Sequence, residues 1–80
     1  PETVEVELAQ QRAAVVEAEA MLADASANAE RARSLQATGA LSEAAINQYL
    51  TAERTAKARL EAQRAAARAR QLRVAQTAVL

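Results

Sequence analysis

The chain has 80 residues, equal numbers of acidic and basic side chains, and neither cysteine nor histidine. Without cysteine and histidine, disulfide frameworks, Cys/His zinc sites and the usual nucleophile and general-base constellations are excluded, so we expect neither an enzyme nor a bound cofactor. Alanine supplies much of the 51% hydrophobic fraction and one tyrosine is the only aromatic residue, which leaves little material for a globular core.

The sequence predicts two long helices joined at Gly39, the only glycine. Good helix formers fill both arms, and the only proline stands at the first position. We expect the first helix over about residues 3–38, a turn over 39–42 and the second helix over about 43–78. The predicted fold class is all-α, an antiparallel two-helix coiled-coil hairpin.

The residues around Gly39 specify the turn. Gly39 can take the left-handed backbone conformation that ends a helix, and Ser42 can cap the N-terminus of the next one. Leu41 precedes this cap and Ile46 stands at the fourth helical position, which is the spacing of a hydrophobic staple. Glu43 suits the positive end of the second helix dipole.

A heptad pattern runs along both arms and predicts the helix seam. Folding at Gly39 places residues whose numbers sum to about 81 opposite one another, so that Leu22 faces Leu60 and Leu35 lies near Ile46. The seam positions are Val4, Leu8, Gln11, Val15, Ala18, Leu22, Ala25, Ala29 and Ala32 in the first arm, and Ile46, Tyr49, Glu53, Ala56, Leu60, Gln63, Ala67, Arg70, Val74 and Thr77 in the second.

The two arms have opposite charge. Residues 1–38 hold seven acidic and three basic side chains, a net charge of −4, whereas residues 39–80 hold three acidic and seven basic ones, a net charge of +4. This asymmetry favours folding back and predicts ion pairs of Glu7 with Arg73 and of Glu19 with Arg64.

Apolar surface remains beyond a two-helix seam, because alanine surrounds much of the second helix and several seam positions are polar. A solvated hairpin and lateral packing onto copies of the chain fit the sequence equally well.

The candidate functional residues lie at the tip of the predicted hairpin. Arg31 and Leu35 are four residues apart and share one face of the first helix, and Ser42 opens the second helix across the turn. Each residue also has a purely structural explanation. Arg31, like Arg33, suits the negative end of the helix dipole, Leu35 can close the seam, and Ser42 is an ordinary cap.

Together, Arg31, Leu35 and Ser42 resemble the R-x3-L-x6-S motif at the hairpin tip of periplasmic adaptor proteins. These proteins, also called membrane fusion proteins or the HlyD-like family, serve Gram-negative tripartite efflux pumps and type I secretion systems. Gly39 stands between the leucine and the serine as it does in that family. Pro1 looks like the proline that follows the first half of a lipoyl-like domain in these proteins. Residues 76–80 look like the strand that leads back into the second half of that domain.

The resemblance implies a fragment of a larger periplasmic protein anchored at the inner membrane. It implies a hexamer whose hairpin tips, through Arg31, Leu35 and Ser42, meet a TolC-like outer-membrane channel, and whose other domains meet an inner-membrane transporter. The flanking lipoyl, β-barrel and membrane-proximal domains then lie outside this sequence.

Other functional classes remain as alternatives. An antiparallel coiled-coil stalk or dimerisation hairpin from an unrelated protein accounts for the helices without any role for the tip. A lipid-surface helix pair needs a basic and aromatic face, which this chain lacks. Nucleic-acid binding is not expected, because the arginines of the second arm have acidic partners in the first arm and no aromatic platform is present.

Overall fold

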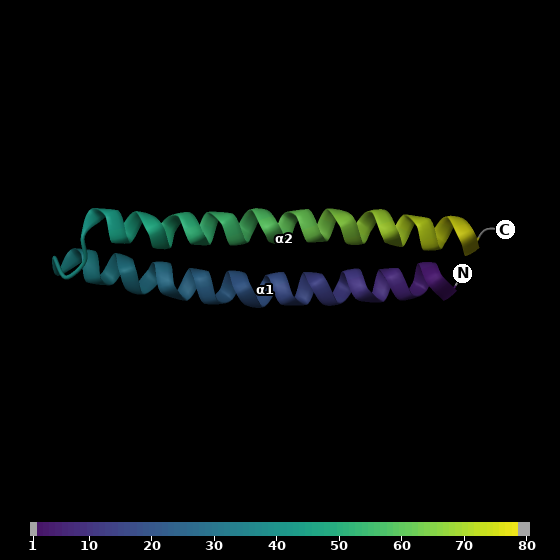
Figure 1. The fold of residues 1–80 in the computed structure, drawn as a ribbon, viewed down its shortest axis with the longest axis horizontal. Coiled ribbons are helices and arrows are strands. Elements are labelled where there is room, and N and C mark those ends of the chain that lie inside the picture. Colours follow the sequence, from purple (N-terminus) through teal and green to yellow (C-terminus); the bar gives the residue numbers. More distant parts are fainter. Residues whose placement is uncertain (1, 79–80) are drawn as a thin grey trace.

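The structure, a computed structural model, describes residues 2–78 as two helices, α1 (Glu2–Ala37) and α2 (Glu43–Ala78). The helices lie side by side and antiparallel, with the turn at one end and both termini at the other (Figure 1). The hairpin measures 62 × 13 × 12 Å along its principal axes. This architecture confirms the predicted all-α hairpin.

The end of α1 is a Schellman motif, in which two amide groups bond back over the last helical turn. Gly39 has a φ of 76°, so it takes the predicted left-handed conformation. Its amide donates to the Gln36 carbonyl at 3.0 Å, and the Ala40 amide donates to the Leu35 carbonyl at 3.1 Å. The glycine therefore reverses the chain while the Leu35 and Gln36 carbonyl groups of α1 stay hydrogen-bonded.

Ser42 caps α2 as its position in the sequence predicts. The Ser42 hydroxyl oxygen accepts a hydrogen bond from the Ala45 amide at 3.1 Å, and its carbonyl accepts one from the Ile46 amide at 3.1 Å. Ile46 is 2% exposed and Leu41 is half-buried, which agrees with the expected apolar closure beside the cap. Glu43 lies in the first turn of α2, where its charge suits the helix dipole.

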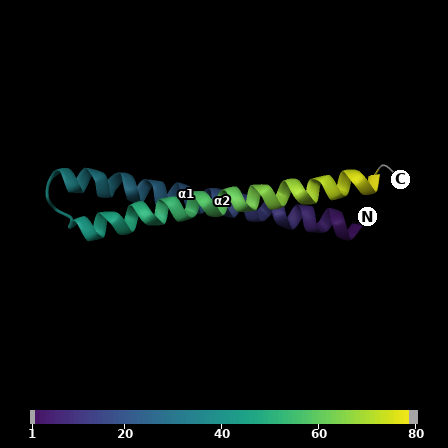
Figure 2. The ribbon, with the colours of Figure 1, turned by 90° about the horizontal axis from the view of Figure 1, so that it is seen from above.

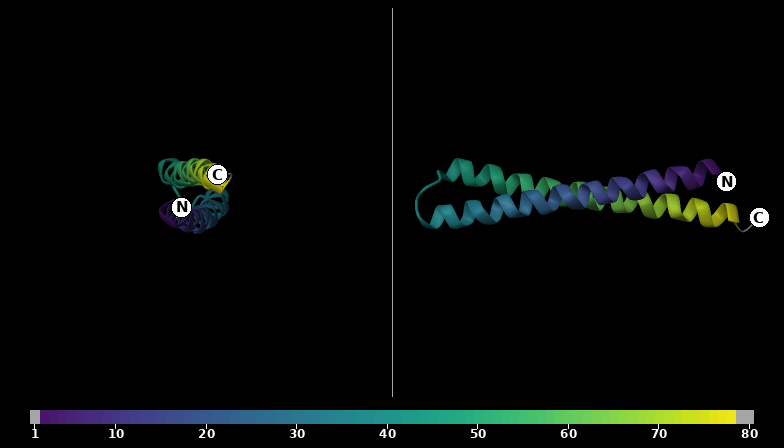
Figure 3. Two further views of the ribbon diagram at one scale, coloured as in Figure 1. Left: turned by 90° about the vertical axis from the view of Figure 1, so that its right-hand side faces the viewer. Right: turned by 90° about the horizontal axis from the view of Figure 1, so that it is seen from below.

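The core is a narrow seam along which the two helices wrap around one another, and Figures 2 and 3 show them crossing near the middle of the hairpin. All nine seam positions predicted in α1 are at least half-buried. The buried side chains all occupy predicted seam positions, and only three of them are larger than alanine: Leu8, Ala18, Ala29, Ala32, Ile46 and Leu60. The predicted thin core is confirmed.

Both predicted ion pairs between the arms are present. Arg73 lies 3.5 Å from Glu7, and Arg64 lies 3.5 Å from Glu19. Because these side chains are largely solvated, each pair stabilises the fold by only ~0.3–0.5 kcal/mol. Their agreement with the expected pairing supports the register in which opposite residue numbers sum to about 81.

The seam prediction is wrong at three positions where the side chain is exposed, Leu35 and Tyr49 near the tip and Thr77 near the other end. Tyr49 is 41% exposed rather than buried, and Leu35 is 43% exposed rather than packed as the last seam residue. The last turn of α1 contains no basic residue, so neither Arg31 nor Arg33 lies where the helix dipole is strongest. A two-helix seam covers these flanks poorly because, within residues 2–78, no third helix or strand packs over them.

The opposite end also differs from the expectation of a strand at residues 76–80. Helix α2 continues to Ala78, so residues 76–78 are helical. Pro1, Val79 and Leu80, which also enter the resemblance, lie outside the described residues. Within residues 2–78, neither helix has a stretch apolar enough to cross a bilayer.

Candidate partner-binding tip

Arg31 and Leu35 lie together on the surface of α1 near the turn. Both side chains are exposed, and both line a shallow depression of about 140 Å³ that α1 forms with the turn and α2. The other lining residues are Asn28, Ala32, Leu41 and Tyr49. The structure thus brings a guanidinium group and an apolar side chain to one concave patch beside the end of the rod.

The guanidinium group of Arg31 is held in place along its own helix. Its Nη2 atom donates to the Asn28 side-chain oxygen one turn earlier. An arginine carries five N–H donors, so this single bond leaves most of the planar donor fork available to a partner. Asn28 therefore orients the Arg31 side chain and leaves its other N–H donors free to bind a partner.

Ser42 lies across the turn and does not line the depression. Its side chain is exposed, but its oxygen already accepts the Ala45 amide. A hydroxyl group has a second lone pair and one hydrogen, so Ser42 can bond a partner while it caps α2. Of the three predicted residues, Arg31 and Leu35 therefore lie together at the depression, and Ser42 lies apart from them at the turn.

Two further residues at the depression were not predicted from the sequence. Tyr49 was assigned to the seam, whereas it lines the depression together with Ala32, and Asn28 was not singled out. The position of Tyr49 could have been suspected because it is the only aromatic residue of the chain and stands close to the turn. A tyrosine combines a large apolar ring with a hydroxyl group, a combination enriched at interfaces.

A polar cluster ties the two helices together just behind the tip. Arg33 of α1 lies 3.1 Å from Glu53 of α2 and 3.4 Å from Glu30 on its own helix. The pKa of Glu53 is lowered from 4.5, first by a hydrogen bond with Ser26 and then by Arg33, against the partial burial that raises it. The ionised carboxylate is therefore the form that the folded hairpin favours.

Among residues 2–78, no group of three or more acidic side chains is placed to hold a metal ion. The depression at the tip is lined by apolar, amide and guanidinium groups, which suit contact with another protein.

Comparison of the chain with models of protein families, with curated proteins and with solved structures finds no match.

Proposed function

We propose that this chain is the helical hairpin of a periplasmic adaptor protein, which bridges an inner-membrane transporter to a TolC-like outer-membrane channel and so supports efflux or secretion. The observation that carries the proposal is the exposed pair of Arg31 and Leu35 at the end of a 62 Å rod, with Ser42 across a tight turn. In a rod of this shape, the side chains near the turn are the ones that a partner at the tip end contacts.

The three residues divide the docking task. The Arg31 guanidinium donates to carbonyl groups that are left unpaired where the helices of the channel end or turn. Leu35 is only partly covered by its own chain, so it fills an apolar groove of the partner. The Ser42 hydroxyl adds a hydrogen bond at the turn.

Export by cells that carry the tip variant tests this role. A protein with Arg31, Leu35 and Ser42 all replaced by alanine should reach normal levels, keep its helices and lose most of its export. Loss of the Ser42 cap costs about 1 kcal/mol, so helicity must be measured by circular dichroism alongside export. Full export by the triple variant contradicts the adaptor role and favours a structural stalk.

A control comes from the half of α1 that lies far from the tip. Arg12 and Val16 are an exposed arginine and an exposed apolar residue four positions apart, like Arg31 and Leu35. Their replacement by alanine, together with Thr3→Ala, should leave export unchanged. Equal loss in both triple variants points to a general loss of stability.

Arg31→Lys separates charge from geometry. Lysine keeps the positive charge but lacks the planar fork of donors. We expect export to fall well below wild type, although less than in Arg31→Ala. Wild-type export in Arg31→Lys shows that charge alone is sufficient at this position.

A further inference from the structure

The depression beside the turn gathers hydrogen-bond donors around an apolar floor. Three polar side chains line it, and they come from both helices: Asn28 and Arg31 of α1 and Tyr49 of α2. The rest of the lining is apolar. Among residues 2–78, no acidic side chain lines the depression. Its charge is therefore positive and is carried by Arg31 alone.

The polar groups of the depression keep unused hydrogen-bonding capacity. None of the ion pairs formed among residues 2–78 involves Arg31. Arg31 donates to the Asn28 side-chain oxygen, so the Asn28 side-chain nitrogen still carries two N–H donors. Within the same residues, no hydrogen bond uses that nitrogen or the Tyr49 hydroxyl. The depression thus offers an unpaired positive charge with donors from three side chains.

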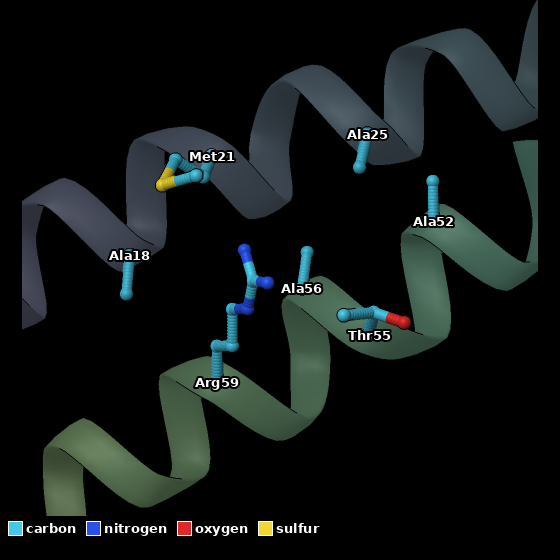
Figure 4. A pocket seen from close by; sticks show the side chains of 7 residues that line it. All are labelled: Ala18, Met21, Ala25, Ala52, Thr55, Ala56 and Arg59. Atoms are coloured by element: carbon cyan, nitrogen blue, oxygen red, sulfur yellow. The ribbon is translucent and has the colours of Figure 1, made fainter.

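The groove midway along the hairpin lacks this set of donors. Figure 4 shows the Arg59 side chain there beside the small side chains of alanine residues. The complete lining is Ala18, Met21, Ala25, Ala52, Thr55, Ala56 and Arg59, so neither an amide nor a phenol group accompanies the guanidinium group. The collected donors distinguish the depression at the tip from this groove.

We propose that the depression binds an acidic side chain of the docking partner, with Asn28 as a positioning residue and Tyr49 as a further contact. This inference rests on the docking role proposed for the tip. A carboxylate accepts two parallel hydrogen bonds from a guanidinium group, and its other lone pairs accept from the Tyr49 hydroxyl and the Asn28 amide. Arg31 keeps further N–H groups for carbonyl groups of the partner.

The size of the depression suits a single side chain. Its volume of about 140 Å³ equals that of roughly five water molecules at ~30 Å³ each. A glutamate side chain has about as many non-hydrogen atoms. Its methylene stem contacts the apolar lining formed by Leu35 and Leu41, while its carboxylate reaches Arg31. The apolar lining also excludes water around the ion pair, which strengthens the attraction between the charges.

Two substitutions of Asn28 separate an acidic partner group from a neutral one. Asn28→Asp keeps an oxygen that orients Arg31, but its charge repels a carboxylate, whereas Asn28→Ala removes the oxygen and adds no charge. We expect the dissociation constant of the full-length protein for the immobilised channel to rise roughly tenfold in Asn28→Asp and about threefold in Asn28→Ala. The reverse order indicates a neutral partner group and overturns the proposal.

Asn47 provides a matched control, because it is the other asparagine of the chain and lies on α2 near the tip, outside the depression. Asn47→Asp adds the same charge and should leave the dissociation constant within about twofold of the wild-type value. Equal weakening by Asn28→Asp and Asn47→Asp contradicts a carboxylate in the depression. Tyr49→Phe removes only the hydroxyl group and should weaken binding roughly fivefold. Wild-type affinity in Tyr49→Phe rejects the contact with Tyr49.

A photocrosslinker at position 49 identifies the bound side chain. In cells, p-benzoylphenylalanine in place of Tyr49 should crosslink to a segment of the channel that contains an aspartate or a glutamate. Replacing that acidic residue by lysine should impair export, and Arg31→Glu in the hairpin should restore it. A crosslinked segment without an acidic residue, or an exchange that does not restore export, refutes the proposal.

Failure of this inference is distinguishable from failure of the docking role. Full export by the variant with Arg31, Leu35 and Ser42 replaced by alanine contradicts docking by the tip altogether. Loss of export in that variant, combined with wild-type channel affinity in Asn28→Asp, retains the docking role and rejects the acidic side chain as the occupant of the depression.

Discussion

Gln11 of α1 crosses the helix seam to Gln63 of α2, where its side-chain nitrogen donates to the Gln63 backbone carbonyl at 3.3 Å and also to the Gln63 side-chain oxygen. Two amides thus face each other at seam positions that otherwise favour apolar side chains. A polar pair in a coiled-coil seam fixes the alignment of the helices at some cost in stability.

The first prediction concerns this pair. Replacing Gln11 and Gln63 together by leucine buries apolar surface and leaves no amide unpaired, so it should stabilise the hairpin by on the order of 1 kcal/mol and raise the melting midpoint by roughly 5 °C. Gln11→Leu alone should gain less, because it strands the Gln63 side chain. Thermal melts followed by circular dichroism measure both. A double variant that melts below wild type contradicts this account.

The second prediction concerns the large side chains of the core. Leu60 is 4% exposed, so Leu60→Ala should cost about 2–5 kcal/mol, enough to unfold a small hairpin. Leu22 is only half-buried, so Leu22→Ala should cost less. Leu72 is 63% exposed and provides the control, since Leu72→Ala should leave the urea midpoint almost unchanged. A reversed order among the three variants rejects the seam register.

The third prediction concerns the turn. An added Cβ at Gly39 meets no atom within 4 Å, so Gly39→Ala costs only the backbone strain of a φ of 76°, about 1 kcal/mol. Gly39→Asn should cost less, because asparagine tolerates the left-handed conformation. Chemical denaturation of the two variants compares them directly. Equal stability of Gly39→Ala and wild type shows that the turn adopts another conformation in solution.

The fourth prediction concerns acid. The pKa of Glu53 is lower in the folded hairpin than its value of 4.5 in the unfolded chain. The stability that this carboxylate contributes is therefore fully present at pH values above 4.5, and it is lost as the pH falls through the lower pKa of the folded state. Ser26→Ala removes the leading cause of the shift and should flatten that part of the stability curve, as should Glu53→Gln. Melts between neutral and acid pH measure the slope. An unchanged acid slope in both variants assigns the acid sensitivity to other carboxylates.

Local sequence signals predicted the fold well because each one acts within a few residues. Gly39 and Ser42 determine where the helices end and begin, and the backbone φ of Gly39 and the hydrogen bond to Ser42 confirm both roles. The heptad spacing then fixes which faces meet, and the pairing of Glu19 with Arg64 follows from it.

The candidate site was less predictable because heptad periodicity describes straight helices and does not describe a turn. Leu41 belongs to the turn, yet it lines the same depression as Leu35 and Tyr49. Its path depends on the left-handed step at Gly39, so the sequence pattern could not place it. The exposure of Leu35 and Tyr49 reflects how few neighbours a two-helix assembly offers near its end.

The carbonyl oxygen of Leu35 has a consequence for how the tip can be read by another molecule. It accepts hydrogen bonds from the Thr38 amide at 3.2 Å, the Thr38 hydroxyl at 2.8 Å and the Ala40 amide at 3.1 Å. The Gln36 carbonyl also accepts a hydrogen bond, so two carbonyl groups of the last turn of α1 already have partners within the chain. A partner cannot use these two acceptors and meets side chains beside them, so we expect hairpins with the same backbone and different tip side chains to differ in the partners that they bind.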